Sequence, residues 1–173
     1  MRWRQPAVII FDVLFEAGSD LGLKPFGIRA MDSLRIEKSY RLVGTELSIE
    51  YAALESGLER FVHPNKGNFI GCNALVEWQQ HGFKWQFVTL EVHNTTDADP
   101  LGNNPIFRDG KPVGRATGGN FGFRVNKSLA LGMVRPEWAQ INTELDMDIL
   151  GTNHKVTVIP ESPYDPENAR LRA

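Results

Sequence analysis

The feature that most constrains the fold is a run of short β-type segments that begins after Lys84 and contains no helical pattern. In residues 88–92 apolar and polar residues alternate, which is typical of a half-buried strand. Asp109 and Gly110 give a strong signal for a β-hairpin between two further segments. Six or seven short strands at this spacing predict a small antiparallel barrel or sandwich. The remaining strands are expected in residues 105–108, 113–117, 121–125, 129–133, 145–149 and 155–159.

A glycine-rich stretch, residues 118–122, interrupts this run. Its composition is similar to that of a phosphate-binding loop, but such loops precede a helix, and this stretch lies between two predicted strands. We therefore expect a bulge or a tight corner here.

The first 82 residues have a different pattern, in which helical and strand-like segments alternate. Residues 6–17 predict a helix that begins near Pro6 and ends at Gly18. Apolar residues surround this helix almost completely, so we expect it to be buried on nearly every face, under a layer that lies upstream or on another chain. Strands are expected in residues 47–51 and 58–62, a short helix in residues 69–80, and a domain boundary near residue 82.

A second helix is predicted in residues 27–41. Ile28, Met31 and Leu34 form an apolar stripe, while Asp32 lies within reach of both Arg29 and Arg35. We also expect Glu37 to pair with Arg41. Tyr40 comes just before Gly44, where the helix should end, and an aromatic ring with a polar tip at that place suits the wall of a ligand site.

Composition excludes several classes of partner. Nineteen basic and 21 acidic residues give a net charge of −2 with both signs dispersed, which argues against nucleic acid and against an anionic membrane surface. No run approaches the ~20 apolar residues of a membrane span. Four scattered histidines predict no metal site, and a single cysteine excludes a disulfide within the chain and fits a reducing compartment.

Four motifs in the first half of the chain carry a resemblance. They are Asp-Ser-Leu-Arg-Ile-Glu-Lys-x-Tyr-Arg from Asp32, Gly-Thr-Glu-Leu from Gly44, Leu-Glu-Ser-Gly-Leu from Leu54 and Lys-Gly-Asn-Phe-Ile-Gly from Lys66. In this order they resemble the second half of the folate-dependent aminomethyltransferase family. That family includes the T-protein of the glycine cleavage system and the folate-binding C-terminal portions of dimethylglycine and sarcosine dehydrogenases. Glu37-Lys38 and the tail 161–172 are more similar to the dimethylglycine dehydrogenase branch.

The resemblance implies an α+β fold. Residues 1–82 would be the C-terminal part of a folate-binding domain, and residues 83–173 a β-barrel domain with an extended tail. The implied activity of the parent protein is transfer of a one-carbon unit from an amine donor to tetrahydrofolate. In the dehydrogenase branch an FAD on a further N-terminal domain first oxidises the amine, and this chain is expected to bind no FAD itself.

The resemblance also implies site residues. Tyr40 occupies the position of a tyrosine that lies against the pterin of tetrahydrofolate, and Tyr164 corresponds to an aromatic residue of the family's tail. Where T-proteins have an arginine suited to a folate carboxylate, this chain has Met31. Arg29 or Arg35 could supply that charge, although each could equally be held by Asp32.

Two functional segments of the family have no counterpart in this chain: the catalytic aspartate, and the Gly-Tyr-Thr-Gly-Glu-like segment with its pterin-binding glutamate. We therefore expect no catalytic residue here and no turnover by the chain alone, with the missing half supplied in cis or by a separate chain. Two alternatives stay open, a non-catalytic folate-binding module and a subunit that docks on a catalytic chain through residues 6–17. A bacterial cytoplasm or a mitochondrial matrix is the expected location.

Overall fold

The computed structural model describes residues 4–95 and 98–173. The chain divides into two compact units, one reaching to Met31 and one from Asp32 to the C-terminus. The predicted boundary near residue 82 lies inside the second unit, shortly before the first barrel strand begins at Gln86.

The first unit consists mainly of helix α1, Arg4–Gly18, which confirms the helix predicted in residues 6–17. A 3-10 turn, η1 (Ser19–Leu21), follows it and ends at Gly22 in the left-handed conformation. The expected burial of α1 is not seen in this chain, because six of its large apolar side chains are more than half exposed. These side chains are Val8, Ile9, Ile10, Phe11, Val13 and Leu14.

Helix α2, Ile28–Glu37, corresponds to the helix predicted in residues 27–41 but ends earlier, because Ser39 takes a left-handed backbone conformation with φ 53°. The expected apolar stripe is not its buried face: Ile28, Met31 and Leu34 are all exposed. The buried side chains are Ser33, Ile36 and Glu37. The predicted contact between Glu37 and Arg41 is also wrong, since Arg41 pairs with Glu161.

Residues 38–85 fold mostly as turns. The strand expected in residues 47–51 is absent, and Ile49 is fully exposed. In place of the strand expected in residues 58–62 there is a 3-10 turn, η2 (Glu59–Phe61), followed by η3 (Pro64–Lys66). The predicted helix in residues 69–80 is confirmed as α3, Cys72–His81, which stops before Gly82.

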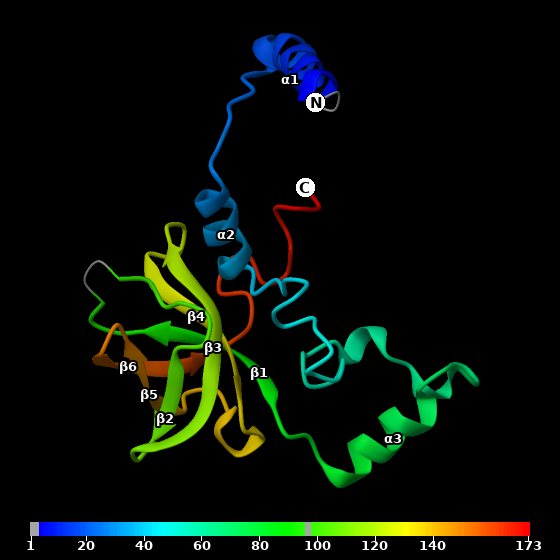
Figure 1. Cartoon of the computed structure of the whole chain (residues 1–173), viewed down its shortest axis with the longest axis vertical. Coiled ribbons are helices and arrows are strands. Elements are labelled where there is room, and N and C mark those ends of the chain that lie inside the picture. Colours follow the sequence, from blue (N-terminus) through cyan, green and yellow to red (C-terminus); the bar gives the residue numbers. More distant parts are fainter. Residues whose placement is uncertain (1–3, 96–97) are drawn as a thin grey trace. The chain divides into compact units, whose positions relative to one another are not determined.

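The C-terminal part of the chain is a closed antiparallel barrel of six strands in the order β1-β4-β3-β2-β5-β6 (Figure 1). This confirms the predicted α+β class and small barrel. The strands are β1 Gln86–Val92, β2 Pro105–Arg108, β3 Lys111–Gly122, β4 Lys127–Val134, β5 Glu144–Ile149 and β6 Thr152–Ile159, with a 3-10 turn, η4 (Pro136–Trp138), before β5.

The turns of the barrel follow the sequence signals. Asp109 and Gly110 both have positive φ, as the hairpin between β2 and β3 requires. The two strands expected in residues 113–117 and 121–125 are one long strand, β3, and its register with β4 shifts between Ala116 and Gly118. Thr117 is thus the extra residue of a β-bulge. The bulge or corner expected in residues 118–122 is wrong, because these residues belong to β3 and pair with β4 in regular register.

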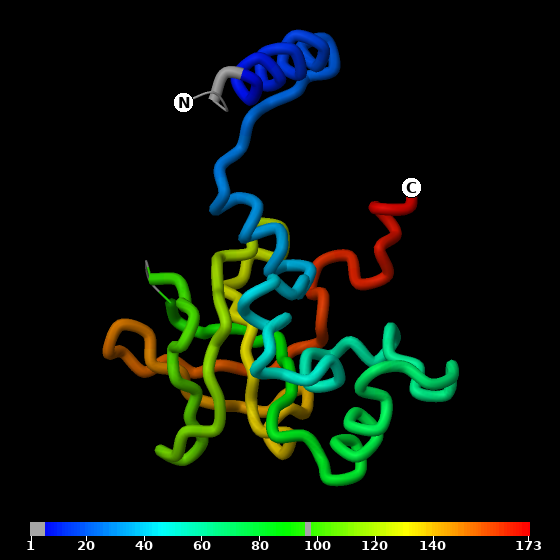
Figure 2. Tube along the Cα trace, turned by 45° about the vertical axis from the view of Figure 1, so that its right-hand side comes forward, coloured from blue at the N-terminus to red at the C-terminus, as the bar shows by residue number. Residues whose placement is uncertain are grey.

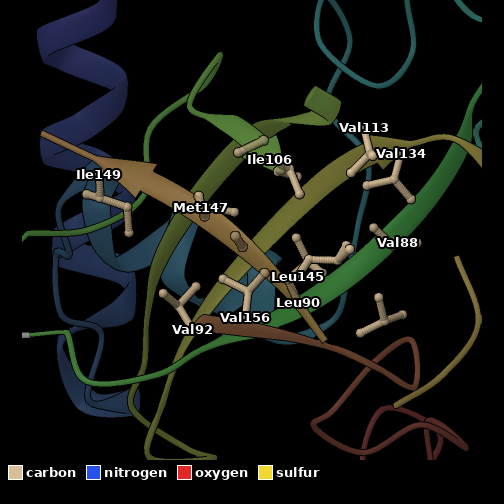
Figure 3. Packing of buried hydrophobic residues seen from close by; sticks show 13 residues of the cluster. Val88, Leu90, Val92, Ile106, Val113, Val134, Leu145, Met147, Ile149 and Val156 are labelled. Carbon is tan, nitrogen blue, oxygen red and sulfur yellow. The ribbon is translucent and has the colours of Figure 1, made fainter. Parts of the chain in front are cut away.

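The barrel core comes from the alternating residues that predicted the strands. Their side chains point into the barrel from all around it, as Figure 3 shows for ten labelled residues. A second, smaller cluster lies on the outer face of β1 and β4, where Ile36 of α2 packs on Leu129, Leu131 and Met133. This contact places the end of α2 on the barrel wall.

Candidate functional site

The end of α2 presents Tyr40 with its ring about half exposed, at 46%. The backbone around it is tightly held, because the Tyr40 N–H donates to the carbonyl of Arg35 at 3.1 Å. In return, Arg35 Nη1 donates to the carbonyl of Tyr40 at 2.8 Å. The backbone of Tyr40 is therefore held in place, while the residue stays about half exposed.

Arg35 is mostly buried and fully engaged. Its Nε donates to Asp32 Oδ1 at 2.9 Å, so the predicted pairing with Asp32 is confirmed for this arginine. The guanidinium also lies 4.0 Å from a carboxylate oxygen of Glu46. With these partners and the Tyr40 carbonyl, Arg35 positions the site rather than presenting a free cation to a ligand.

Glu46 is completely buried and fixes the loop that follows Tyr40. Its Oε2 accepts hydrogen bonds from the Leu42 N–H at 2.9 Å and from Thr45 Oγ1 at 2.6 Å, and its Oε1 accepts one from Thr117 Oγ1. Burial raises the pKa of this carboxyl, but the hydrogen bonds from Thr117, Thr45 and Leu42 together lower it by more. The net result is a lowered pKa and an ionised buried carboxylate.

The C-terminal tail returns to the end of α2 (Figure 2, orange to red beside the cyan segment). The Ser162 N–H donates to Ser39 Oγ at 2.9 Å, and Ser162 Oγ donates to the carbonyl of Lys38 at 2.8 Å. The Tyr164 N–H donates to the carbonyl of Glu37 at 3.1 Å. We call these contacts between residues 37–41 and 161–165 the tail clasp.

Lys38 connects the two candidate tyrosines. Its Nζ donates to the carbonyls of Tyr164 at 3.2 Å and Asp165 at 2.6 Å, and it lies 5.9 Å from the centre of the Tyr40 ring. Arg41 completes the tail clasp by pairing with Glu161 while it stacks 3.9 Å over the ring of Phe87. The structure thus brings Tyr40 and Tyr164 to the same end of α2.

The other two predicted residues are placed differently. Arg35 contacts the Tyr40 carbonyl, whereas Arg29 belongs to the first unit. Met31 occupies the position where the resemblance expects an arginine, and its side chain is 47% exposed.

A pocket of about 300 Å³ adjoins the far side of Glu46, since both of its hydroxyl donors, Thr45 and Thr117, line it. Across the pocket Arg115 donates to the Tyr51 hydroxyl from Nε at 3.0 Å and pairs with Glu50. The hydrogen bond to Tyr51 is the largest reason that the pKa of Arg115 is raised. Sequence reasoning missed these residues because Tyr51 and Glu50 were assigned to a strand.

Two kinds of site are absent from the parts of the chain that the structure covers. Residues 4–95 and 98–173 contain no group of three or more histidine, cysteine or carboxylate side chains that could hold a metal ion. Within the same ranges, none of the helices has the length and apolar character needed to cross a membrane.

Two family models match the sequence. The model described as the glycine cleavage T-protein C-terminal barrel domain matches residues 86–165, and the GCVT N-terminal domain model matches residues 3–66. The first match corresponds to the barrel, whose first strand begins at Gln86 and whose last strand ends at Ile159.

Among known proteins, mitochondrial dimethylglycine dehydrogenase from Mus musculus is 36% identical over 170 residues, which are 98% of this chain and 19% of the relative. An aminomethyltransferase from Desulfitobacterium hafniense is 37% identical over 155 residues, 90% of this chain and 42% of the relative. The chain thus spans about a fifth of the first relative and about two fifths of the second.

A solved structure shares the fold. The crystal structure of glycine cleavage system aminomethyltransferase T from Bartonella henselae matches with a TM-score of 0.80 and 23% identity, over 90% of this chain and 44% of that one. Both family models, the relatives and the barrel lead to the same conclusion: the chain belongs to the glycine cleavage T-protein (aminomethyltransferase) family.

Proposed function

We propose that this chain is the C-terminal portion of a tetrahydrofolate-dependent aminomethyltransferase or dimethylglycine dehydrogenase-like protein, and that it supplies one wall of the folate site. In the parent protein an amine donor would give a one-carbon unit to tetrahydrofolate. The observation that carries the proposal is the joint anchoring of Tyr40 and Tyr164 by Lys38, in a chain of this family.

In this proposal Tyr40 stacks against the flat pterin ring, because its ring is half exposed while its backbone is fixed from both sides. Tyr164 forms the neighbouring part of the wall. Arg35 contributes by holding Tyr40 in place, and Arg29 remains a candidate for the charged part of the ligand. The parent would hold FAD only if it is of the dehydrogenase branch. A bacterial cytoplasm or a mitochondrial matrix is the proposed location.

The test is calorimetric titration of the 173-residue chain with 5-formyltetrahydrofolate, a stable reduced folate. We expect saturable binding that Tyr40→Ala weakens about tenfold, the loss of about 1.4 kcal/mol that stacking of one ring accounts for. Tyr40→Phe keeps the ring and should keep the affinity. Tyr51→Ala is the control, because Tyr51 lies in the separate pocket beside Arg115. An unchanged affinity in Tyr40→Ala would exclude Tyr40 from the folate wall.

Docking on a separate catalytic chain is the second candidate, and the exposed apolar side chains of α1 favour it. In that case an affinity-tagged chain should co-purify with a chain that carries the family's catalytic aspartate. Changing the apolar residues Ile10 and Val13 to serine should abolish the co-purification while folate binding is kept. Saturable folate binding with neither a partner nor transfer would instead identify a non-catalytic folate-binding module.

A further inference from the structure

The pocket beside Arg115 lies over the bulge of β3. Residues of the loop 44–51 line it together with Gly102, Asn103 and residues 115–117. Its volume of about 300 Å³ is at the lower end of the range for small-molecule sites. The residues of the tail clasp do not line it, so it is separate from the candidate folate wall.

The guanidinium of Arg115 is held by neutral groups as well as by a carboxylate. Its Nε and Nη2 donate to the Tyr51 hydroxyl oxygen at 3.0 and 2.6 Å, and its Nη1 donates to Asn103 Oδ1 at 3.3 Å. The Tyr51 ring packs on the smaller apolar cluster outside β1 and β4, and the Asn103 N–H donates to the Ala116 carbonyl at 2.8 Å. The guanidinium therefore keeps a defined position even without Glu50.

The other polar groups around the pocket have hydrogen-bond donors to spare. The Tyr51 oxygen accepts two N–H groups of Arg115, so its own O–H proton points away from the guanidinium. The Ser48 oxygen accepts the Glu50 N–H at 3.2 Å. Within residues 4–95 and 98–173, no acceptor meets the hydroxyl protons of Tyr51 and Ser48 or the side-chain amide protons of Asn103. The pocket thus offers donors to a ligand that brings acceptors.

Glu50 shows which kind of acceptor the guanidinium takes. Its carboxylate pairs with Arg115, although the side chain of Glu50 is 61% exposed and that of Arg115 is 42% exposed. An ion pair with this much exposure contributes little to stability, so a carboxylate from solution can replace that of Glu50 at small cost. The buried Glu46 does not compete, because both of its oxygens accept hydrogen bonds and Arg35 lies 4.0 Å from it.

We infer that this pocket binds a small aliphatic carboxylate, which replaces the Glu50 side chain on Arg115. A guanidinium matches a carboxylate in bidentate geometry, and the hydroxyl groups of Tyr51 and Ser48 supply further donors. The aliphatic part of the ligand covers Ile49, which lines the pocket and is fully exposed. The site is independent of the proposed folate wall.

Fluorine NMR of the chain labelled with 3-fluorotyrosine tests this inference, because the chain has three tyrosines. Tyr51 lies in the pocket, while Tyr40 and Tyr164 lie at the end of α2, so one spectrum reports on the two sites separately. The probe is isobutyrate, and isobutyramide is its uncharged counterpart of similar shape. We expect isobutyrate to move only the Tyr51 signal, with saturation in the millimolar range, and isobutyramide to bind about tenfold more weakly.

Two substitutions should change the affinity for isobutyrate in opposite directions. Arg115→Gln removes the guanidinium and should weaken binding about tenfold. Glu50→Gln removes the competing carboxylate and should tighten binding about threefold, as loss of an exposed ion pair allows. Arg60→Gln and Glu59→Gln are the matched controls, because both residues are exposed in η2, and neither should change the affinity.

The inference is overturned if the Tyr51 signal responds equally to the acid and the amide, or to neither. Parallel movement of all three tyrosine signals, as a general salt effect would produce, overturns it too. So does a Glu50→Gln chain that binds isobutyrate no more tightly than the unaltered chain. That variant changes an exposed side chain, so it decides the question even where Arg115→Gln lowers the unfolding midpoint. The test uses no folate, so its failure is distinct from a failure of the proposed function.

Discussion

Glu46 shows at the scale of one residue how this chain fixes a loop without regular structure. Its carboxylate is completely buried, and its hydrogen-bond donors come from the loop itself and from the bulge residue Thr117. The bulge turns Thr117 toward the carboxylate, so an irregularity of the barrel serves the loop beside the candidate folate wall.

The lowered pKa of Glu46 predicts a pH dependence of stability. Because the folded chain lowers this pKa from its ordinary value of 4.5, the ionised carboxylate stabilises the fold above that value. The contribution is lost as the pH falls through the lowered pKa. At neutral pH, Glu46→Gln should reduce the free energy of unfolding by about 1–3 kcal/mol, and this difference should shrink in acid.

Urea denaturation from about pH 7 down to about pH 3 would measure this effect. Glu59→Gln serves as the control, since Glu59 is an exposed residue of η2. A Glu46→Gln effect that stays constant over the whole pH range would show that ionisation of Glu46 does not stabilise the fold.

The burial of carboxylates is also the property that the sequence predicts least well. Glu37, Glu46 and Glu55 are all almost completely buried, whereas amphipathic patterns assign glutamate to solvent. Oε1 of Glu55 accepts the N–H groups of Lys84 and Trp85, and its Oε2 accepts that of Ala52. Lys84 and Trp85 are brought to Glu55 by the tertiary fold, so no local pattern could have indicated these two partners.

At the scale of elements, two neighbouring glycines of β3 differ in how closely other atoms pack around them. A Cβ at Gly119 would lie 2.6 Å from Pro100 Cβ and 2.9 Å from the carbonyl oxygen of Leu129, while a Cβ at the neighbouring Gly118 would meet only Arg35 Nη2 at 3.5 Å. Gly119→Ala should therefore lower the free energy of unfolding by about 1–3 kcal/mol. Gly118→Ala should change it much less. Equal effects of the two substitutions in urea denaturation would contradict this account of the glycine-rich stretch.

The tail clasp makes a second prediction at this scale. Removal of residues 161–173 deletes every contact of the clasp, whereas removal of residues 167–173 keeps them all. At about 1 kcal/mol for each hydrogen bond, the first truncation should lower the free energy of unfolding by several kcal/mol, and the second much less. Faster amide hydrogen exchange in residues 36–41 should accompany only the first truncation. Unchanged exchange there would show that the clasp does not hold the end of α2.

The same elements show which parts of the fold a sequence can predict. The barrel strands alternate because one face is buried in a closed sheet, and the signal at Asp109 and Gly110 is local to the hairpin. Residues 47–51 alternate equally well, but they have no strand to pair with, and Ile49 is exposed. In α2, the barrel selects Ser33, Ile36 and Glu37 as the buried face, although the apolar periodicity favours another. Tyr40 was indicated by its place near the helix end and by the resemblance, and Tyr164 by the resemblance alone. The link of both to Lys38 depends on the position of the tail, which no local pattern predicts.

At the scale of the whole chain, α1 predicts how the protein behaves in solution. With six large apolar side chains more than half exposed, the 173-residue chain should bind a hydrophobic dye and self-associate at micromolar concentration. Exchange of Ile10 and Val13 for serine should reduce both effects. A monomer that binds no dye in sedimentation and fluorescence measurements would contradict the expectation that another body covers α1.

The central claim is that this chain completes a folate-dependent aminomethyl transfer site that a second body must supply in part. The most direct test measures methylenetetrahydrofolate formation from tetrahydrofolate and an aminomethyl donor. The chain alone is compared with the chain fused behind the N-terminal half of the Desulfitobacterium hafniense aminomethyltransferase. We predict no turnover by the chain alone, and turnover by the fusion that falls about tenfold in kcat/KM with Tyr40→Ala. Turnover by the chain alone, or a folded fusion whose turnover is indifferent to Tyr40, would contradict the claim.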